Sequence, residues 1–216
     1  PYMISYTQKE AGFESSIKET ILRIDAPESI HSLCKKLTKF LVVEGKDDVI
    51  LADTGVKLMQ KLHQMYSGTV KFESGNSMVL DTFKAEYIYD NFCSNKIGIF
   101  YKFKEELNAL KQIYGELLCT DLETFNTTDK TIALQIVSGR EGISLKEAKY
   151  LVYYNIDFSA TSYWQSRDRM TTKDRPENEI FWIFTSKGIE DKIYKAVSKK
   201  KDYTLKHFKR DLLTLN

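Results

Sequence analysis

The sequence has 216 residues, of which 42% are hydrophobic and 12% aromatic, which suits one packed domain with a smaller appendage. The net charge of +2 excludes a uniformly basic nucleic-acid coat, and three scattered cysteines without a C-x-x-C pair argue against a zinc ribbon or a disulfide scaffold. No apolar run approaches the roughly 20 residues of a membrane span and no signal peptide is visible, so we expect a cytoplasmic protein without membrane contact.

The chain up to about residue 66 has mostly helical spacing. Apolar residues recur every three or four positions over 29–43 and again over 54–66. Residues 67–80 are then typical of a hairpin, with Gly68 before it and a turn at 74–76. We assign residues 1–50 to a helical connector or lead-in segment.

From about residue 93 the pattern changes to short apolar strands that alternate with amphipathic helices. An expected helix at 80–92, with Asp81 as a suitable N-cap, precedes this part. Strands are expected at 96–101, 131–137, within 143–155 and at 179–184, and helices at 102–115, 159–170, 188–200 and 203–213. This alternation predicts an α/β fold with a parallel sheet that helices cover on both faces. We assign residues 51–216 to one such domain, which ends in basic helices.

Parallel α/β sheets bind their ligands at the carboxyl ends of the strands. Residues 138–142 (SGREG) follow one expected strand and residues 155–169 follow the next. We therefore expect the arginine-rich end of the second segment to lie near that binding edge. In a helix, Gln165 and Arg169 would lie one turn apart on one face.

Motifs for gripping a nucleotide or a metal are missing from the chain. There is no Walker A loop and no G-x-G-x-x-G, so a nucleotide would have to be held mainly by something else. His31 and Cys34 lack a complementary pair of ligands, and we predict no metal site there.

Residues 41–50 (LVVEGKDDVI) resemble the first motif of the Toprim nuclease and primase fold, in which a Glu and a later Asp-x-Asp hold magnesium. The chain has no Asp-x-Asp, and a solvated turn around Glu44 is the alternative.

Several segments in a fixed order resemble the second RecA-like motor domain of superfamily-two helicases, in the Swi/Snf-type branch. They are 96–115 (KIGIFYKFKEELNALKQIYG), 134–170 (LQIVSGREGISLKEAKYLVYYNIDFSATSYWQSRDRM) and 178–197 (NEIFWIFTSKGIEDKIYKAV). The resemblance covers about residues 50–200 and looks closest to phage and prophage DNA helicases, which implies a bacterial or phage-infected host cell. It implies a RecA-like parallel sheet flanked by helices, with a helical and hairpin lead-in before it.

The resemblance also implies roles for individual residues. Residues 99–103 (IFYKF) resemble motif IV, whose strand end leads to DNA backbone contacts, here Lys102 and Lys104. Residues 138–145 (SGREGISL) resemble motif V. The motif V residues that would approach the DNA phosphates are Ser138, Gly139 and Arg140. Those that would face the nucleotide cleft are Glu141 and Gly142.

Residues 165–169 (QSRDR) resemble motif VI, with Gln165 and Arg169 facing a cleft between two motor domains. An arginine there stabilises charge on a transferring γ-phosphoryl group. The family pattern is Q-x-x-x-R-x-x-R, and the position of its second arginine is occupied here by Thr172. Either Arg175 returns to the cleft, or Arg169 acts alone, or the cleft is impaired. We favour Arg169 together with Arg175.

The function implied is the second motor lobe of an ATP-dependent DNA helicase or translocase. Its partners would be DNA and an N-terminal RecA-like lobe of the same longer chain, which would hold most of the ATP and Mg²⁺. We expect this chain alone to be monomeric and to have little or no ATPase activity. The alternatives are a DNA- or protein-binding module that has lost hydrolysis, which Thr172 favours, and the Toprim-like nuclease.

Three basic or aromatic features have simpler structural explanations. Arg167 could form an ordinary surface pair with Asp168, and Trp164 is expected to belong to the core rather than to a base-stacking platform. The tail 198–211 has six basic side chains and two acids, which suits either DNA phosphates or a solvated helix face.

Overall fold

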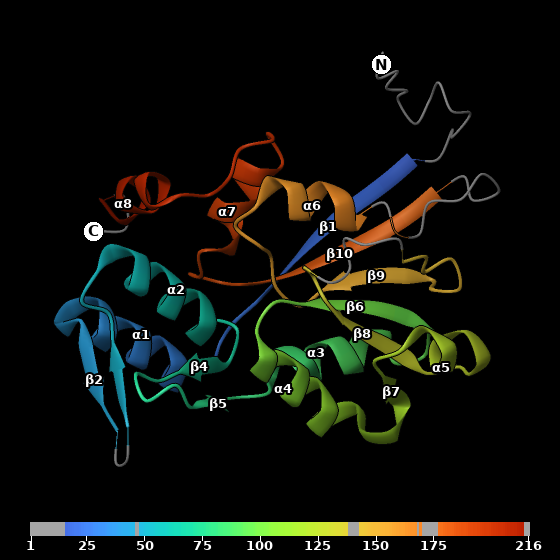
Figure 1. Cartoon of the computed structure of the whole chain (residues 1–216), viewed down its shortest axis with the longest axis horizontal. Helices are drawn as coiled ribbons and strands as arrows, with labels where there is room; N and C mark the ends of the chain where they lie inside the picture. The colour runs from blue at the N-terminus through green and yellow to red at the C-terminus, as the bar shows by residue number, and fades with distance from the viewer. Residues whose placement is uncertain (1–15, 46–47, 138–142, 168, 170–176, 214–216) are drawn as a thin grey trace, which may run out of the picture.

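The computed structural model of the chain describes residues 16–45, 48–137, 143–167, 169 and 177–213. Its centre is a six-stranded sheet, parallel throughout, with the strand order β1-β10-β9-β6-β8-β7 (Figure 1). Its strands are β1 (Ser16–Ile24), β6 (Ile97–Tyr101), β7 (Leu118–Cys119), β8 (Thr131–Gln135), β9 (Tyr150–Tyr153) and β10 (Glu177–Thr185). The predicted α/β fold with a RecA-like parallel sheet is therefore confirmed.

Helices cover both faces of the sheet. In chain order they are α1 (Glu28–Phe40), α2 (Gly55–Met65), α3 (Phe83–Phe92), α4 (Lys104–Tyr114), the short 3-10 helix η1 (Gly115–Leu117), α5 (Leu122–Thr127), α6 (Ala160–Arg167), α7 (Glu190–Val197) and α8 (Leu205–Leu213). α3 and α4 pack on one face, whereas α6 and α7 pack on the other (Figure 1). Every helix of the described segments is too short or too polar to cross a bilayer.

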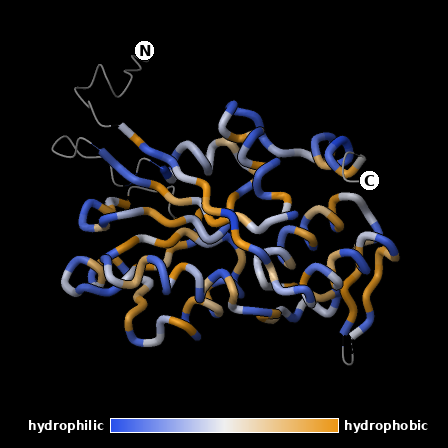
Figure 2. Tube along the Cα trace, turned by 180° about the vertical axis from the view of Figure 1, so that it is seen from behind, coloured by the Kyte–Doolittle hydropathy of each residue, from blue (hydrophilic) through white to orange (hydrophobic). Residues whose placement is uncertain are grey.

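Alternation along each strand builds two hydrophobic layers. In β10, Trp182 and Phe184 join the layer beneath α6 and α7, whereas Ile183 joins the layer beneath α3 and α4. Because successive strand residues point to opposite faces, an almost continuous apolar strand is needed when both faces are covered. Figure 2 shows hydrophobic residues following the strands through the middle of the molecule.

The lead-in forms a separate group beside the carboxyl ends of the strands. α1 and α2 pack together there with two antiparallel hairpins (Figure 1). The hairpins are β2 (Val42–Glu44) with β3 (Val49–Leu51), and β4 (Thr69–Lys71) with β5 (Ser77–Val79). The expected hairpin at 67–80 and the expected helices at 29–43 and 54–66 are confirmed within a few residues, whereas the β2–β3 hairpin was not predicted.

The first part of the chain corrects the sequence-based expectation of helix. Ser16–Ile24 is a nine-residue strand that pairs with β10 from end to end, so the sheet does not begin near residue 93. The helical assignment failed because β1 alternates charged and apolar residues on both of its faces. Glu19 pairs with Arg167 of α6, and Arg23, which is 53% exposed, pairs with Asp191 of α7. These charged residues hide the period-two pattern of a strand.

A fully buried ion pair ties the two helical layers to the sheet. The Lys84 Nζ of α3 lies 2.9 Å from Glu190 Oε1 of α7 and also donates to the carbonyls of Tyr154 and Ile183. Both side chains are completely buried. Removing one partner of such a pair would leave an uncompensated charge in the core, so the pair fixes how the two layers sit.

Candidate functional site

The segment after β6 is shaped by a buried carboxylate. Glu106, on the first turn of α4, accepts hydrogen bonds from the backbone N–H groups of Lys102 (2.7 Å) and Phe103 (3.0 Å). A third donor is the Asn155 side-chain amide, at 2.6 Å from Glu106 Oε1. Asn155 follows β9, so Glu106 joins the carboxyl ends of two neighbouring strands.

The same cluster continues into the lead-in. His63 of α2 donates from Nε2 to Asn155 Oδ1, which also accepts the backbone N–H of Ile156. Burial, together with the nearby cations Lys102 and Lys84, holds the pKa of His63 well below its usual value, so the imidazole stays neutral. Burial also raises the pKa of Glu106, although the hydrogen bonds that it accepts oppose this shift. We call Glu106, Asn155 and His63 the carboxyl-edge cluster.

The two lysines predicted to contact DNA have different surroundings. Lys102 Nζ lies 2.7 Å from Asp157 Oδ1 and 3.8 Å from the centre of the Phe158 ring, and its side chain is only 13% exposed. Burial lowers the pKa of Lys102. For Asp157, the effect of burial is outweighed by the charge and hydrogen bond of Lys102, and its pKa is lowered too. Lys104, at the start of α4, is exposed.

The glycine-containing segment expected to form motif V lies mostly outside the described residues. These positions are Ser138, Gly139, Arg140, Glu141 and Gly142. The strand before them, β8, ends at Gln135, whose side-chain amide donates to the Lys102 carbonyl at 3.1 Å. The end of β8 therefore lies beside Lys102.

The helix predicted to carry motif VI is confirmed as α6. Of the two proposed caps, Ser159 begins it, because its Oγ accepts the Ser162 N–H at 3.4 Å. Gln165 is exposed on this helix and Arg169, just beyond its end, is partly exposed. Whether these two residues meet a nucleotide stays a prediction. Arg175 and Thr172 lie outside the described residues.

The expected position of the arginine cluster needs correction. α6 begins at the carboxyl edge but runs back across the sheet over β1 and β10 (Figure 1). The Arg169 carbonyl accepts the N–H of Leu145, which precedes β9 by five residues and packs on Gly98 in the first half of β6. Arg169 thus lies over the amino-terminal half of the sheet, because a helix that follows a parallel strand returns antiparallel to it.

Arg167 pairs with Glu19 of β1, whereas Asp168, its expected partner, lies outside the described residues. Arg167 Nη2 lies 2.7 Å from Glu19 Oε1, and the two side chains are 12% and 13% exposed. The same carboxylate accepts hydrogen bonds from three more groups. They are the Tyr163 hydroxyl (2.9 Å), the Trp182 indole N–H (2.8 Å) and the Tyr194 hydroxyl (3.3 Å). We call Glu19 and these four partners the Glu19 cluster.

Neither cluster could be predicted from the sequence, except at one position. Glu106 stands at the third position of α4, where a Glu is typical of a helix start that bonds back to the preceding backbone.

Trp164 is partly buried, donates from its indole to the Val197 carbonyl at 3.0 Å and packs on the core, which agrees with its expected structural role.

The segment that resembles a Toprim motif lies away from the parallel sheet. Glu44 ends β2 and is exposed on the β2–β3 hairpin, while Asp48 Oδ1 accepts the Val49 N–H in the turn. Among the described residues, no three His, Cys, Asp or Glu side chains gather where they could hold a metal ion. The exposure of Glu44 at the end of a short hairpin strand agrees with the solvated-turn interpretation.

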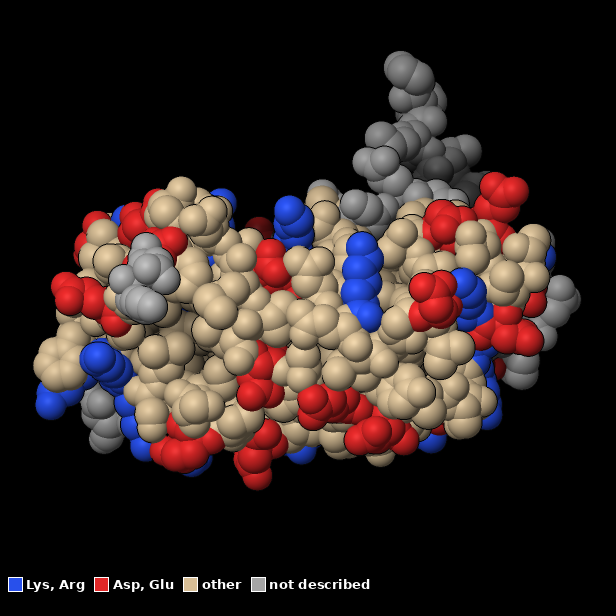
Figure 3. Space-filling view, turned by 90° about the horizontal axis from the view of Figure 1, so that it is seen from below, with Lys and Arg blue, Asp and Glu red and all other residues tan. Residues whose placement is uncertain are grey.

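Charge is spread unevenly over the surface. The face shown in Figure 3, which looks onto the molecule from below, carries carboxylates along one edge and only scattered lysines and arginines. On this view there is no broad basic stripe, which agrees with the small net charge.

Comparison with known proteins supports the fold. Two solved structures, the SWI2/SNF2 ATPase core domain of Sulfolobus solfataricus and the same core in complex with dsDNA, are similar with TM-scores of 0.55 and 0.57. Their sequences are 16% and 15% identical to this one, over 85% of this chain but only 43% and 44% of theirs. A third, the C-terminal part of the Fun30 ATPase domain, is 20% identical over 60% of this chain and 47% of its own, with a TM-score of 0.45. This chain thus spans less than half the length of these neighbours.

Comparisons of the sequence alone found no match. No family model matches the chain, and no curated protein is significantly similar to it. At such low identities, the structural likeness establishes the RecA-like fold and leaves the activity to be argued from the residues.

Proposed function

We propose that this chain is the C-terminal motor lobe of an ATP-dependent DNA helicase or translocase of the Swi/Snf type. The observation that carries the proposal is the order of the motifs on one parallel sheet. Residues 102–104 follow β6, residues 138–142 follow β8, and α6 with Gln165 and Arg169 follows β9. This sheet has the fold of SWI2/SNF2 ATPase cores, one of which was solved with dsDNA. A first lobe in the same longer chain, and a phage or prophage source, belong to this proposal.

The carboxyl edge would hold the DNA. Lys104 is an exposed cation there, and we assign it the first phosphate contact, together with Ser138, Gly139 and Arg140. Lys102 would reach a phosphate only by leaving Asp157, so its main role would be to order the loop next to Lys104. The backbone of that loop is already fixed by Glu106, which would keep the contact in register as the lobe moves.

The opposite half of the sheet would meet the nucleotide. Gln165 and Arg169, with Glu141, Gly142 and Arg175, would bind and orient its phosphates. The fixed charge of Arg169 would offset negative charge as it develops on the γ-phosphoryl group. Bound ATP would supply the free energy of phosphoryl transfer. We assign the Mg²⁺ ligands and the Walker lysine to the first lobe.

α6 connects the two edges and gives the lobe its mechanical role. The helix begins beside the carboxyl edge at Ser159 and ends beside Arg169 over the other half of the sheet. Because α6 is locked to β1 and β10 through Glu19, closure on a nucleotide would move the whole sheet and its DNA-contacting edge as one body.

DNA-stimulated ATP hydrolysis tests the proposal in two proteins, this chain alone and the longer chain that includes the upstream lobe. We expect activity only in the longer chain. Hydrolysis by neither protein, with DNA binding retained, would overturn the motor proposal and favour a binding module on the same fold, for which Thr172 would be the natural cause.

A further inference from the structure

A pocket of about 720 Å³ lies between α1, α2, α7 and α8. Its floor is apolar and is made by Leu58, Leu62, Ile189 and Phe208, each at most 6% exposed. This volume and this lining are typical of sites that take up ligand or side-chain groups from outside. No residue of the proposed motor sites lines it.

The rim of the pocket is positive. Lys35 and Lys39 of α1, Lys187 after β10 and Lys192 of α7 line it, and the first three are exposed. Within the described residues, none of these four lysines forms an ion pair. The one acid in the lining is Asp211.

The carboxylate of Asp211 attracts Lys192 and offsets part of this charge. Its carboxylate accepts the Tyr203 hydroxyl at 2.9 Å and pairs with Arg210 at 3.0 Å. Lys192 reaches only the backbone carbonyl of Asp211, at 3.1 Å, and burial lowers its pKa. Four cations therefore surround an apolar floor without a matching set of anions.

The turn that carries Lys187 is held in an unfavourable conformation. Lys187 has φ +66°, which costs an ordinary residue roughly 1–2 kcal/mol. The next residue, Gly188, has no space for a side chain because the buried Glu190 carboxylate and the Thr185 carbonyl occupy it. The core thus fixes this turn, and such strain is typical of functional positions.

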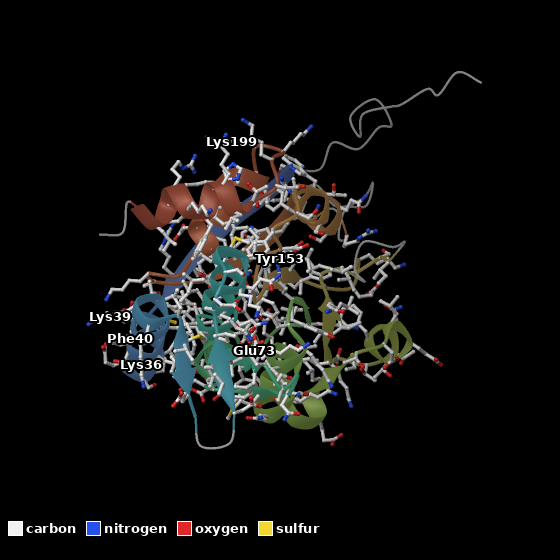
Figure 4. All side chains as sticks on the ribbon, turned by 60° about the vertical axis from the view of Figure 1, so that its left-hand side comes forward. Lys36, Lys39, Phe40, Glu73, Tyr153 and Lys199 are labelled. Carbon is white, nitrogen blue, oxygen red and sulfur yellow. The ribbon has the colours of Figure 1, made fainter. Side chains whose placement is uncertain are left out.

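Exposed apolar side chains extend along the same helices. Phe40 (56% exposed) and Leu41 (42%) end α1, and Val56 (43%) begins α2. Figure 4 shows Lys36, Lys39 and Phe40 projecting outward from α1. Large apolar residues beside a lysine rim are typical of a surface that a protein partner covers.

We propose that this pocket docks an acidic amphipathic helix of a partner protein. Apolar side chains on one face of the helix would fill the floor, and carboxylates flanking them would pair with the lysine rim. Duplex DNA fits less well, because its phosphate backbone offers no apolar group for the floor. A small anion would leave the floor empty for the same reason.

The probe is a fluorescein-labelled peptide of about 18 residues, with Leu at i, i+4 and i+7 and Glu at the flanking positions. Two further peptides replace either the Leu residues by Gln or the Glu residues by Lys. We expect fluorescence anisotropy to detect binding of the first peptide only, with an affinity that falls as salt rises.

Two double variants separate the rim from overall charge. Lys39→Gln with Lys187→Gln removes two rim lysines, whereas Lys36→Gln with Lys199→Gln removes two exposed lysines that do not line the pocket. Both change the net charge equally. We expect the first to weaken peptide binding about fivefold and the second to leave it unchanged, with both proteins equally stable to heat.

Four results would overturn the proposal. They are no binding of the Leu/Glu peptide, equal losses in the two double variants, equal binding of the Leu-to-Gln peptide, and displacement of the peptide by a short DNA duplex. The last would instead assign the lysine rim to nucleic acid. Because the test uses this chain and no nucleotide, its outcome does not depend on the motor proposal.

Discussion

Glu19 and Glu106 are both buried carboxylates that join separate elements, but they are held by different kinds of donor. Glu106 is completely buried and accepts from neutral groups, among them the Asn155 amide, two backbone N–H groups and Ser67. Glu19 accepts from three neutral groups and also pairs with the Arg167 guanidinium. A carboxylate among neutral donors can give up its charge at small cost, whereas one that faces a buried cation cannot.

Glu19→Gln is the substitution expected to have the largest effect. It leaves Arg167 almost buried without a counter-charge, which costs about 3–5 kcal/mol of unfolding free energy. Urea unfolding measures this loss. The matched control is Glu179→Gln, which breaks the exposed Lys18–Glu179 pair between the same two strands and should cost no more than about 1 kcal/mol.

The indole of Trp182 gives a second measurement of the same substitution. Its N–H donates to Glu19, whereas that of Trp164 donates to the Val197 carbonyl. The N–H resonance of Trp182 should shift in Glu19→Gln while that of Trp164 stays in place. Equal losses of stability in Glu19→Gln and Glu179→Gln would contradict the proposed role of Arg167.

His63 makes the carboxyl-edge cluster sensitive to pH. Its folded pKa lies well below 6.5, so below pH 6.5 the unfolded chain binds a proton at this position that the folded chain does not. The stability that the neutral imidazole contributes is present above pH 6.5 and is lost as pH falls, by up to about 1.4 kcal/mol per pH unit. The raised pKa of Glu106 acts in the opposite direction, since it favours the folded state at low pH.

Comparing the native protein with His63→Gln isolates the effect of His63 on the pH dependence of stability. Glu106 is present in both proteins, and the Gln amide can still donate to Asn155. Unfolding free energies measured between pH 7 and pH 5 should fall more steeply in the native protein than in the variant. Parallel curves would mean that His63 is accessible to protons in the folded state.

Glu106→Gln should have the smallest effect on stability, about 1 kcal/mol. The new amide oxygen can accept the N–H groups of Lys102 and Phe103, and only the bond from Asn155 is lost. Removing the charge also removes the cost of burying it. A loss as large as that of Glu19→Gln, by the same urea measurement, would remove the distinction between the two carboxylates.

The sequence was sufficient to predict the apolar strands and the helices between them, because each strand is buried on both faces and each helix has one apolar stripe. It failed for β1, whose Glu19 and Arg23 are satisfied by residues more than 140 positions away. Periodicity describes neighbours in sequence and cannot show such partners.

For the candidate site, too, only part of the arrangement could be predicted from the sequence. The strands and helices that carry the expected motif segments could be inferred, and the structure agrees with them for the described residues, whereas the roles of those segments stay predictions. The position of Arg169 was predicted wrongly, although a parallel sheet already implies that α6 returns antiparallel to the strand before it. The pairing of Lys102 with Asp157 was also missed, since 55 residues separate them.

The central claim is tested most directly by comparing two arginines of one segment in the longer chain. Arg169→Ala should lower the rate of DNA-stimulated ATP hydrolysis by about a thousandfold or more, because it removes the charge that we propose faces the γ-phosphoryl group. Arg167→Ala should lower stability instead, because it leaves Glu19 without its cation. If Arg169→Ala retained full ATPase activity, Arg169 would not serve the nucleotide, and the motor-lobe assignment of α6 would be contradicted.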